Sequence, residues 1–402
     1  MMLLDQPLTL LASGGGAESL AGVLFALLVI YTASKLGGEL AVRVNLPAVL
    51  GELVLGVLVG VSGLGLIRGD GAFIEILAEL GVIILLFEIG LESDLKELLR
   101  VGPQAALVAV TGVVAPFALG TGGLMFIFGV GVIPAVFAGA ALTATSIGIT
   151  ARVLADVQRL NSTEGQIIIG AAVMDDILGI IILAVVSGLA SRGEVQPFQV
   201  GGIVVAAVGF LVVAIAVGRW AAPYFMRVVN ALKTRGDLLI ASLLFALGLA
   251  YIATVIGSEA ILGAFAAGLV LAETDKKETL EERLRPVADV FVPVFFVLVG
   301  AKTNLGVLNP FNPQDREGLI VACFLILAAV VGKVVTGLVV FGPPVNRWAI
   351  GVGMVPRGEV GLIFAGVGSA SGVLPPSLDA ALIVMVIVTT FMAPPLLRLV
   401  FR

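Results

Sequence analysis

The chain has 402 residues, of which 59% are hydrophobic and 13% charged, and its formal net charge is −5. A soluble globular protein would carry about a quarter charged residues, so the composition favours a chain embedded in a lipid bilayer. The absence of histidine excludes histidine metal sites and Ser–His–Asp triads, the single Cys323 excludes an intrachain disulfide, and no basic tract suggests nucleic acid binding.

Apolar stretches occupy most of the chain. Residues 1–16 lack a basic start and are interrupted by Asp5 and Pro7, so we expect a flexible extracytoplasmic lead and no cleavable signal peptide. Thirteen stretches then approach the roughly 20 residues that a transmembrane helix needs. They cover residues 17–35, 45–64, 72–92, 103–128, 132–153, 165–190, 199–218, 237–256, 258–273, 286–303, 317–341, 347–372 and 377–398. We therefore predict an all-α polytopic membrane protein with 13 transmembrane helices.

Cationic residues give these spans an orientation. With the N-terminus outside, thirteen spans place the C-terminus inside. Of the 23 Lys and Arg residues, Lys333 and Arg357 then lie within spans and only four lie outside, at Arg68, Arg192, Lys302 and Arg316. This bias follows the positive-inside rule and predicts an integral membrane protein with the N-terminus outside and the C-terminus cytoplasmic. The charge-rich residues 273–285 are expected to form a solvated cytoplasmic loop.

The chain also aligns with itself when it is shifted by about 211 residues. Residues 47–51 (PAVLG) then match residues 259–263 (EAILG), and 87–95 match 297–305. Extending this register predicts a first six-helix repeat over residues 17–192, a linker helix over 199–218 and a second repeat over 237–402. Seven spans separate the members of each pair, so the halves insert with opposite orientation. Inverted repeats are typical of transporters whose site lies near the bilayer midplane.

Two spans in corresponding positions of the repeats contain helix-breaking segments. Proline removes a backbone donor and clashes with the preceding turn. We predict that residues 132–153 and 347–372 both unwind at mid-membrane and cross there; the alternative is that their small residues only aid packing. The candidate residues at these breaks are Thr143, Thr145, Ser146, Pro356, Arg357 and Glu359.

Adjacent carboxylates, Asp175 and Asp176, lie in the middle of residues 165–190. Each charge within a bilayer costs from about 2.5 kcal/mol upward, so such residues usually face an ion, a cavity or a partner. Lys333 is the only lysine deep within a predicted span. The simplest arrangement pairs Lys333 with one aspartate and leaves the other to hold a cation. The alternative is a salt bridge that only locks two helices together.

These motifs resemble those of the bacterial cation:proton antiporters of the NapA/Kef type, in the second monovalent cation:proton antiporter family. The resemblance runs from residues 46–52 (LPAVLGE) through 87–92 (FEIGLE), 143–146 (TATS) and the aspartate pair to 356–359 (PRGE). It implies the NhaA/NapA-like fold with crossed discontinuous helices, a homodimer, and a place in a bacterial inner membrane. Helices 1–3 and 8–10 would form a scaffold, and helices 4–6 and 11–13 a mobile core. In such proteins Asp176 would bind the Na⁺ beside Asp175, and Asp175 would pair with Lys333.

We therefore expect a secondary transporter and not an enzyme, exchanging Na⁺ or Li⁺ for H⁺ electrogenically by alternating access, with a role in pH homeostasis. It would need no cofactor, and its partners would be the monovalent cation, protons, membrane lipid and a second copy of the chain. K⁺/H⁺ exchange is the main alternative, although the resemblance favours Na⁺ because potassium-directed Kef systems carry a nucleotide-binding tail and lack the first aspartate. Two more distant alternatives are a cation channel and an intramembrane aspartyl protease. A channel would be distinguished by flux that is neither saturable nor coupled to a gradient. A protease would need its two aspartates on separate, facing helices, whereas Asp175 and Asp176 are adjacent on one.

Overall fold

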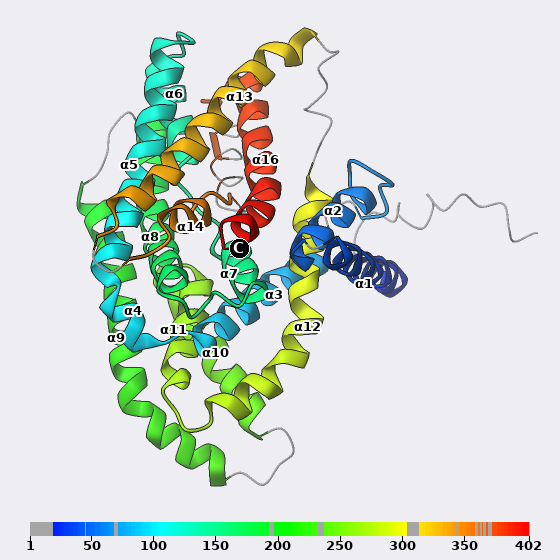
Figure 1. Cartoon of the computed structure of the whole chain (residues 1–402), viewed down its shortest axis with the longest axis vertical. Coiled ribbons are helices and arrows are strands. Elements are labelled where there is room, and N and C mark those ends of the chain that lie inside the picture. The colour runs from blue at the N-terminus through cyan, green and yellow to red at the C-terminus, as the bar shows by residue number, and fades with distance from the viewer. Residues whose placement is uncertain are drawn as a thin grey trace, which may run out of the picture. The chain divides into compact units, whose positions relative to one another are not determined.

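Helices account for all regular structure in the described part of the chain. The computed structural model describes residues 19–44, 46–67, 71–192, 197–231, 237–303, 313–341, 344–357, 361, 364, 367–368 and 372–401, and no strand occurs within these ranges. Figure 1 shows the helices. Their bounds are α1 Leu20–Arg43, α2 Ala48–Val59, α3 Ala72–Glu92, α4 Leu95–Arg100, α5 Gly102–Phe126, α6 Val132–Ala141, α7 Ile147–Asp156, α8 Thr163–Arg192, α9 Pro197–Ala231, α10 Asp237–Val255, α11 Ala260–Ala272, α12 Lys277–Lys302, α13 Pro313–Val334, the 3₁₀ helix η3 Val335–Val339, α14 Arg347–Gly353 and α16 Pro376–Val400.

The all-α polytopic fold is confirmed. A described helix lies within each of the thirteen predicted spans. Among the described residues, eight helices are long and apolar enough to cross a membrane, and α2, α6 and α11 are shorter apolar helices. The count of thirteen transmembrane helices therefore stays a prediction, and the predicted lead over residues 1–16 lies outside the described residues.

Two surface segments differ from expectation. The predicted solvated loop is wrong for residues 277–285, because α12 already begins at Lys277 and carries Glu278 in its first turn. Acidic residues there stabilise the positive end of the helix dipole. The short helix α4 was not predicted, although Asp94 caps it by accepting hydrogen bonds from the backbone N–H groups of Lys96 at 2.8 Å and Glu97 at 3.2 Å. An Asp followed three residues later by Glu is a sequence signal for such a helix start.

The chain divides into two compact units, and the first comprises residues 1–82 and 288–304. In this unit α2 crosses the last turns of α12 at glycine: a Cβ atom on Gly56 would collide with the carbonyl oxygen of Val297. The helices α1 and α2 approach in the same way, because a Cβ on Gly51 would collide with the carbonyl oxygen of Gly37. Glycine allows two helix backbones to come this close.

The second unit comprises residues 83–287 and 305–402 and contains equivalent crossings. A Cβ on Gly268 of α11 would collide with the carbonyl oxygen of Phe87 of α3. Similarly, a Cβ on Gly263 of α11 would collide with the carbonyl oxygen of Leu249 of α10.

The candidate site lies in a bundle within this second unit. Helix α5 packs against α6, α8 and α13, and α16 packs against α13, α14 and α7. The apolar core of this bundle includes Phe137, Ala329, Phe364 and Leu382, all fully buried. The short helices α6, α7 and α14 are thereby enclosed by longer ones, which places their ends inside the bundle.

Candidate ion site

Helix α8 carries the two adjacent aspartates. Asp175 is 1% exposed and Asp176 is 6% exposed, so both carboxylates lie within the bundle. Neighbouring residues on a helix point about 100° apart. The two side chains can therefore face different partners from one helix, as the sequence pattern predicted.

Asp175 is paired with Lys333. The Lys333 Nζ atom donates to Asp175 Oδ2 at 2.9 Å, and both side chains are 0% exposed. The other carboxylate oxygen of Asp175, Oδ1, is buried and accepts no hydrogen bond from the described residues. Lys333 is thus the donor that compensates this carboxylate, in surroundings where an uncompensated charge is costly.

Lys333 also stands where its helix changes geometry. It lies in the last turn of α13, and the chain continues as the 3₁₀ helix η3. The Thr336 hydroxyl donates to the carbonyl oxygen of Lys333 at 2.6 Å. A 3₁₀ turn is common at the end of an α-helix, and here it ends the helical segment at Val339.

Two helix breaks meet beside this bundle. Residues 142–146 separate α6 from α7, and 354–357 follow α14 without helical structure. The backbone N–H of Ser146 donates to the carbonyl oxygen of Pro356 at 2.9 Å, and the Thr145 hydroxyl donates to that of Met354 at 3.3 Å. Thr143, by contrast, donates within its own segment, to the carbonyl oxygen of Ala140 at 2.7 Å. The structure therefore brings Thr145, Ser146 and Pro356 together.

Arg357 joins the two breaks. It is fully buried, and its Nη1 donates to the carbonyl oxygens of Ala144 at 2.7 Å and Met354 at 3.4 Å. Its Nη2 donates to the carbonyl oxygen of Ala329 on α13 at 3.5 Å. The guanidinium thus compensates the carbonyl groups of Ala144 and Met354, which lie in the breaks, and also reaches a carbonyl group of α13. Glu359, the other charged candidate at this break, lies outside the described residues.

Sequence reasoning missed two threonines that hold these breaks. The Thr150 hydroxyl donates to the carbonyl oxygen of Gly353 at 2.9 Å, and the Thr390 hydroxyl donates to that of Arg357. A signal existed in each case, because a hydroxyl in an otherwise apolar helix needs an acceptor. The sequence could not identify the acceptor, because both carbonyls belong to a distant segment.

The arrangement suits a small cation that competes with protons. Carboxylate and carbonyl oxygens are the ligands that hard cations prefer. Asp176 supplies a carboxylate next to the Asp175–Lys333 pair, and the breaks contain backbone that is not committed to a helix. A cation bound there would act electrostatically on Asp175 and Lys333, because adjacent charges in a low dielectric interact strongly.

Comparisons with known proteins agree with this chemistry. The family model described as "Sodium/hydrogen exchanger, transmembrane" matches residues 23–402. The high-affinity Na⁺/H⁺ antiporter NhaS3 of Synechocystis is 62% identical, over 95% of this chain and 90% of its own. The Na⁺/H⁺-K⁺ antiporter GerN of Bacillus cereus is 35% identical, over 94% of this chain and 96% of its own.

Solved structures show the same fold. The sodium proton antiporter MjNhaP1 from Methanocaldococcus jannaschii, solved at pH 8, superposes with a TM-score of 0.67. The match covers 94% of this chain and 97% of that protein, at 18% sequence identity.

Proposed function

Because the chain belongs to the sodium/hydrogen exchanger family, we propose that this integral membrane protein exchanges Na⁺ or Li⁺ for protons by alternating access. One observation carries the proposal: Asp176 lies next to a fully buried Asp175–Lys333 ion pair, in a bundle that also encloses two meeting helix breaks. Natural membrane proteins keep such charges at ion and proton pathways.

Asp176 is the proposed carrier of the transported ion. A carboxylate can hold either Na⁺ or a proton, and both compete for the same oxygens. When one ion is released on one side of the membrane and the other is taken up, the two gradients become coupled without another energy source. Binding of Na⁺ at Asp176 and Asp175 would also weaken the attraction between Asp175 and Lys333.

Lys333 is the proposed second proton carrier. Its ammonium is kept charged inside the bundle by Asp175, from which it lies 2.9 Å away. When Na⁺ displaces it, the buried lysine loses this compensation and releases its proton. More than one proton then moves per Na⁺, which makes exchange electrogenic.

The inverted repeat and its division into scaffold and core are proposed from matching contacts. The Gly56–Val297 crossing and the Gly268–Phe87 crossing pair the same repeat positions with the halves exchanged. The contact between Gly51 and Gly37 has its counterpart at Gly263 and Leu249. Such reciprocity is what a two-fold relation between inverted halves requires. The mobile core would then contain α5 to α8, α13, α14 and α16, and the scaffold would form the homodimer.

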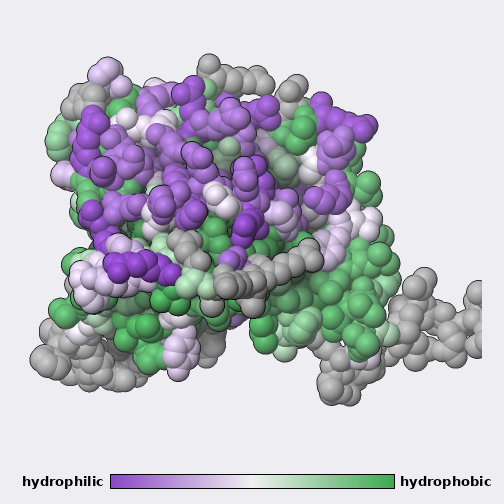
Figure 2. All heavy atoms as spheres, turned by 90° about the horizontal axis from the view of Figure 1, so that it is seen from below, coloured by the Kyte–Doolittle hydropathy of each residue, from purple (hydrophilic) through white to green (hydrophobic). Residues whose placement is uncertain are grey.

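The orientation is proposed from charge. With the N-terminus outside, the loops predicted to be inside carry most of the Lys and Arg residues. Figure 2 shows hydrophilic side chains gathered over the face seen from below and hydrophobic side chains beside it. We place this face toward the cytoplasm of a bacterial cell.

Proton movement in proteoliposomes tests the function. A preset pH gradient is followed with a pH-sensitive dye, and Na⁺, Li⁺ and K⁺ are added in turn to the wild type and to Asp176→Asn. We expect Na⁺ and Li⁺ to collapse the gradient in the wild type and none of the ions to do so in the variant. Equal collapse in folded Asp176→Asn would refute the assignment of the ion site, and no response of folded wild type would refute exchange.

Potassium exchange is the second candidate, since a relative of 35% identity is named for Na⁺/H⁺-K⁺ antiport. The same assay decides between them. Collapse of the gradient by K⁺ alone would assign the chain to K⁺/H⁺ exchange, and collapse by both ions would indicate a shared site.

A further inference from the structure

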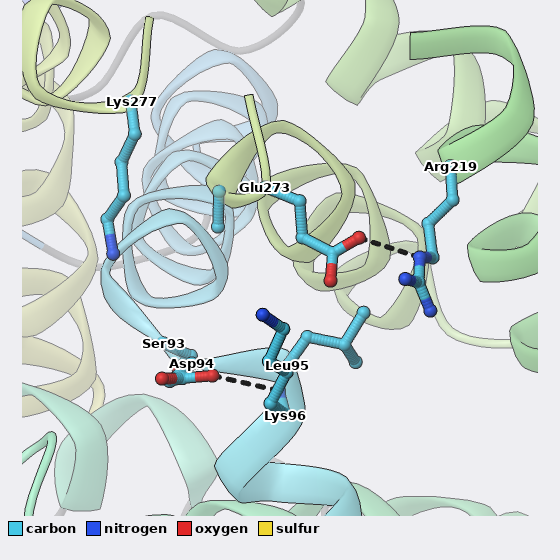
Figure 3. Close-up of a pocket in the computed structure, with 8 residues that line it drawn as sticks. Ser93, Asp94, Leu95, Lys96, Arg219, Glu273 and Lys277 are labelled. Carbon is cyan, nitrogen blue, oxygen red and sulfur yellow. Dashed lines mark hydrogen bonds and ion pairs between the residues drawn. The ribbon is translucent and has the colours of Figure 1, made fainter. Parts of the chain in front are cut away.

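The structure contains a polar cavity whose lining does not include Asp175 or Asp176. Its volume is about 430 Å³, and it opens where α3 leads into α4 (Figure 3). Four separate elements contribute charged side chains to it: Lys96 comes from α4, Arg219 from α9, Glu273 from the end of α11 and Lys277 from the start of α12. Such convergence from distant parts of the sequence is typical of binding sites.

The carboxylates that line this cavity already have donors. Arg219 Nε and Glu273 Oε2 form an ion pair at 2.6 Å. Asp94 Oδ1 accepts from the two backbone N–H groups at the start of α4, at 2.8 and 3.2 Å. These acidic groups are therefore committed, which leaves the lysines as the groups available to a ligand.

Two ammonium groups extend into the same space. Both lysines line the cavity, and Figure 3 shows Lys277 descending on the left of the view and Lys96 below Glu273. Lys96 has no ion-pair partner among the described residues. Lys277 has only long contacts, at 3.6 Å to Glu281 Oε1 and 3.4 Å to the carbonyl oxygen of Glu92. Like charges that converge on one cavity repel each other unless an anion lies between them.

Aromatic side chains indicate at which level of the membrane this cavity lies. Trp220 and Tyr224, which follow Arg219 on α9, are 70% and 52% exposed. The Arg227 guanidinium lies 4.7 Å from the centre of the Tyr224 ring. Exposed Trp and Tyr with neighbouring Arg mark the lipid headgroup region of a membrane protein. Arg219 therefore lies at the depth of the lipid phosphates.

We propose that this cavity binds a phosphate-bearing anion through Lys96 and Lys277, with the headgroup of an acidic lipid as the favoured source. Charge-assisted contacts from ammonium groups to phosphate are among the strong polar contacts in proteins. The bound anion joins α4, which packs on α5 and α8, to α9 and the start of α12. A further consequence rests on the proposed exchange function. Because α8 carries the aspartates, an anion in the cavity restrains the helices of the ion site and slows exchange.

Thermal melting of the full chain in a zwitterionic detergent tests the binding without transport. Phosphatidylglycerol, phosphatidylcholine or sn-glycerol 3-phosphate is added to the wild type and to the double variant Lys96→Gln/Lys277→Gln. The matched control is Lys35→Gln/Lys276→Gln, which changes the net charge equally at two lysines that do not line the cavity. Lys96→Arg/Lys277→Arg keeps both charges and guards against loss through misfolding.

We expect phosphatidylglycerol to raise the melting temperature of the wild type, the control and the arginine variant, and phosphatidylcholine to have no effect. Its apparent affinity should fall about tenfold for each lysine removed. An equal shift with glycerol 3-phosphate supports the phosphate site and assigns its source as soluble. Equal loss in the control, or no shift of the wild type with either anion, overturns the proposal. Failure of Na⁺ exchange in a protein that phosphatidylglycerol stabilises would refute the proposed function alone.

Discussion

Substituting one member of the buried Asp175–Lys333 pair should lower the free energy of unfolding more than substituting both. In Lys333→Gln, Asp175 loses the charged donor at 2.9 Å, while its Oδ1 has no other hydrogen bond to fall back on among the described residues. Breaking a buried pair in this way costs about 3–5 kcal/mol, because one charge is left uncompensated. The double variant Asp175→Asn/Lys333→Gln leaves two neutral amides that can bond to each other, so its cost should be smaller than that of either single variant.

The assay is the unfolding free energy or melting temperature of all three variants in detergent. The control is Arg43→Gln, which removes an exposed pair with Glu39 whose side chains are 72% and 60% exposed. That pair should contribute no more than about 0.5 kcal/mol. In vesicles, Lys333→Gln should retain slower exchange that no longer responds to voltage, because the variant has no lysine proton to release when Na⁺ binds. Additive effects of the two single substitutions, or a Lys333→Gln variant as stable as wild type, would refute the reasoning.

Three further outcomes follow from the geometry. Arg357→Met should destabilise the protein by at least about 3 kcal/mol, since charged hydrogen bonds contribute about 1.5–3 kcal/mol each, whereas Thr150→Val should cost about 1 kcal/mol; comparable melting temperatures would contradict this. Gly268→Ala should lower the melting temperature because the new Cβ would meet the Phe87 carbonyl oxygen, whereas Gly248→Ala meets no atom within 4 Å and should leave it unchanged. In wild-type vesicles, a potential of 100 mV acting on one net charge per cycle supplies about 2.3 kcal/mol and should shift the equilibrium Na⁺ ratio about fiftyfold; a ratio that does not depend on voltage would show one proton per Na⁺.

The helical architecture followed from apolar length and charge placement, because lipid demands helices with satisfied backbones. The errors in predicted secondary structure arose at the ends of the apolar spans, where the chain passes from lipid into water. Residues 277–285 looked like a solvated loop because they are highly charged, yet a helix whose first turns extend beyond the apolar region keeps its backbone bonds and exposes its charges. The N-cap at Asp94 was also visible in the sequence, but the charged residues after it were likewise taken for a loop between two spans.

Candidate site residues could be identified because burying a charge in an apolar span has a high free-energy cost. Their partners could be identified only in part. A buried charge within an apolar span must have a compensating group, so Lys333 could be matched with one of the two aspartates, and the resemblance to the antiporters implied that this aspartate is Asp175. Arg357 could not be assigned in this way, because its acceptors are carbonyl oxygens at Ala144, Met354 and Ala329. Every residue carries such an oxygen, and only the three-dimensional path of the chain shows which of them come within reach of the guanidinium.

The division of labour between the two buried cations bears on the proposed stoichiometry. A guanidinium stays charged in proteins, and Arg357 is fixed to three carbonyl groups, so it can neither give up a proton nor leave its place. Lys333 has one strong partner, Asp175, and that partner is the group a cation at Asp176 would disturb. With Na⁺ bound and Lys333 neutral, the ion and the groups Asp175, Asp176 and Lys333 sum to one negative charge. With Asp176 protonated and Lys333 charged they sum to zero, so the two loaded states differ by one charge. If Lys333 kept its proton throughout, both sums would be zero and voltage would not act on the cycle. The proposed electrogenic exchange would therefore depend on Lys333, which a single carboxylate holds, while the three carbonyl bonds of Arg357 keep the guanidinium out of proton transfer.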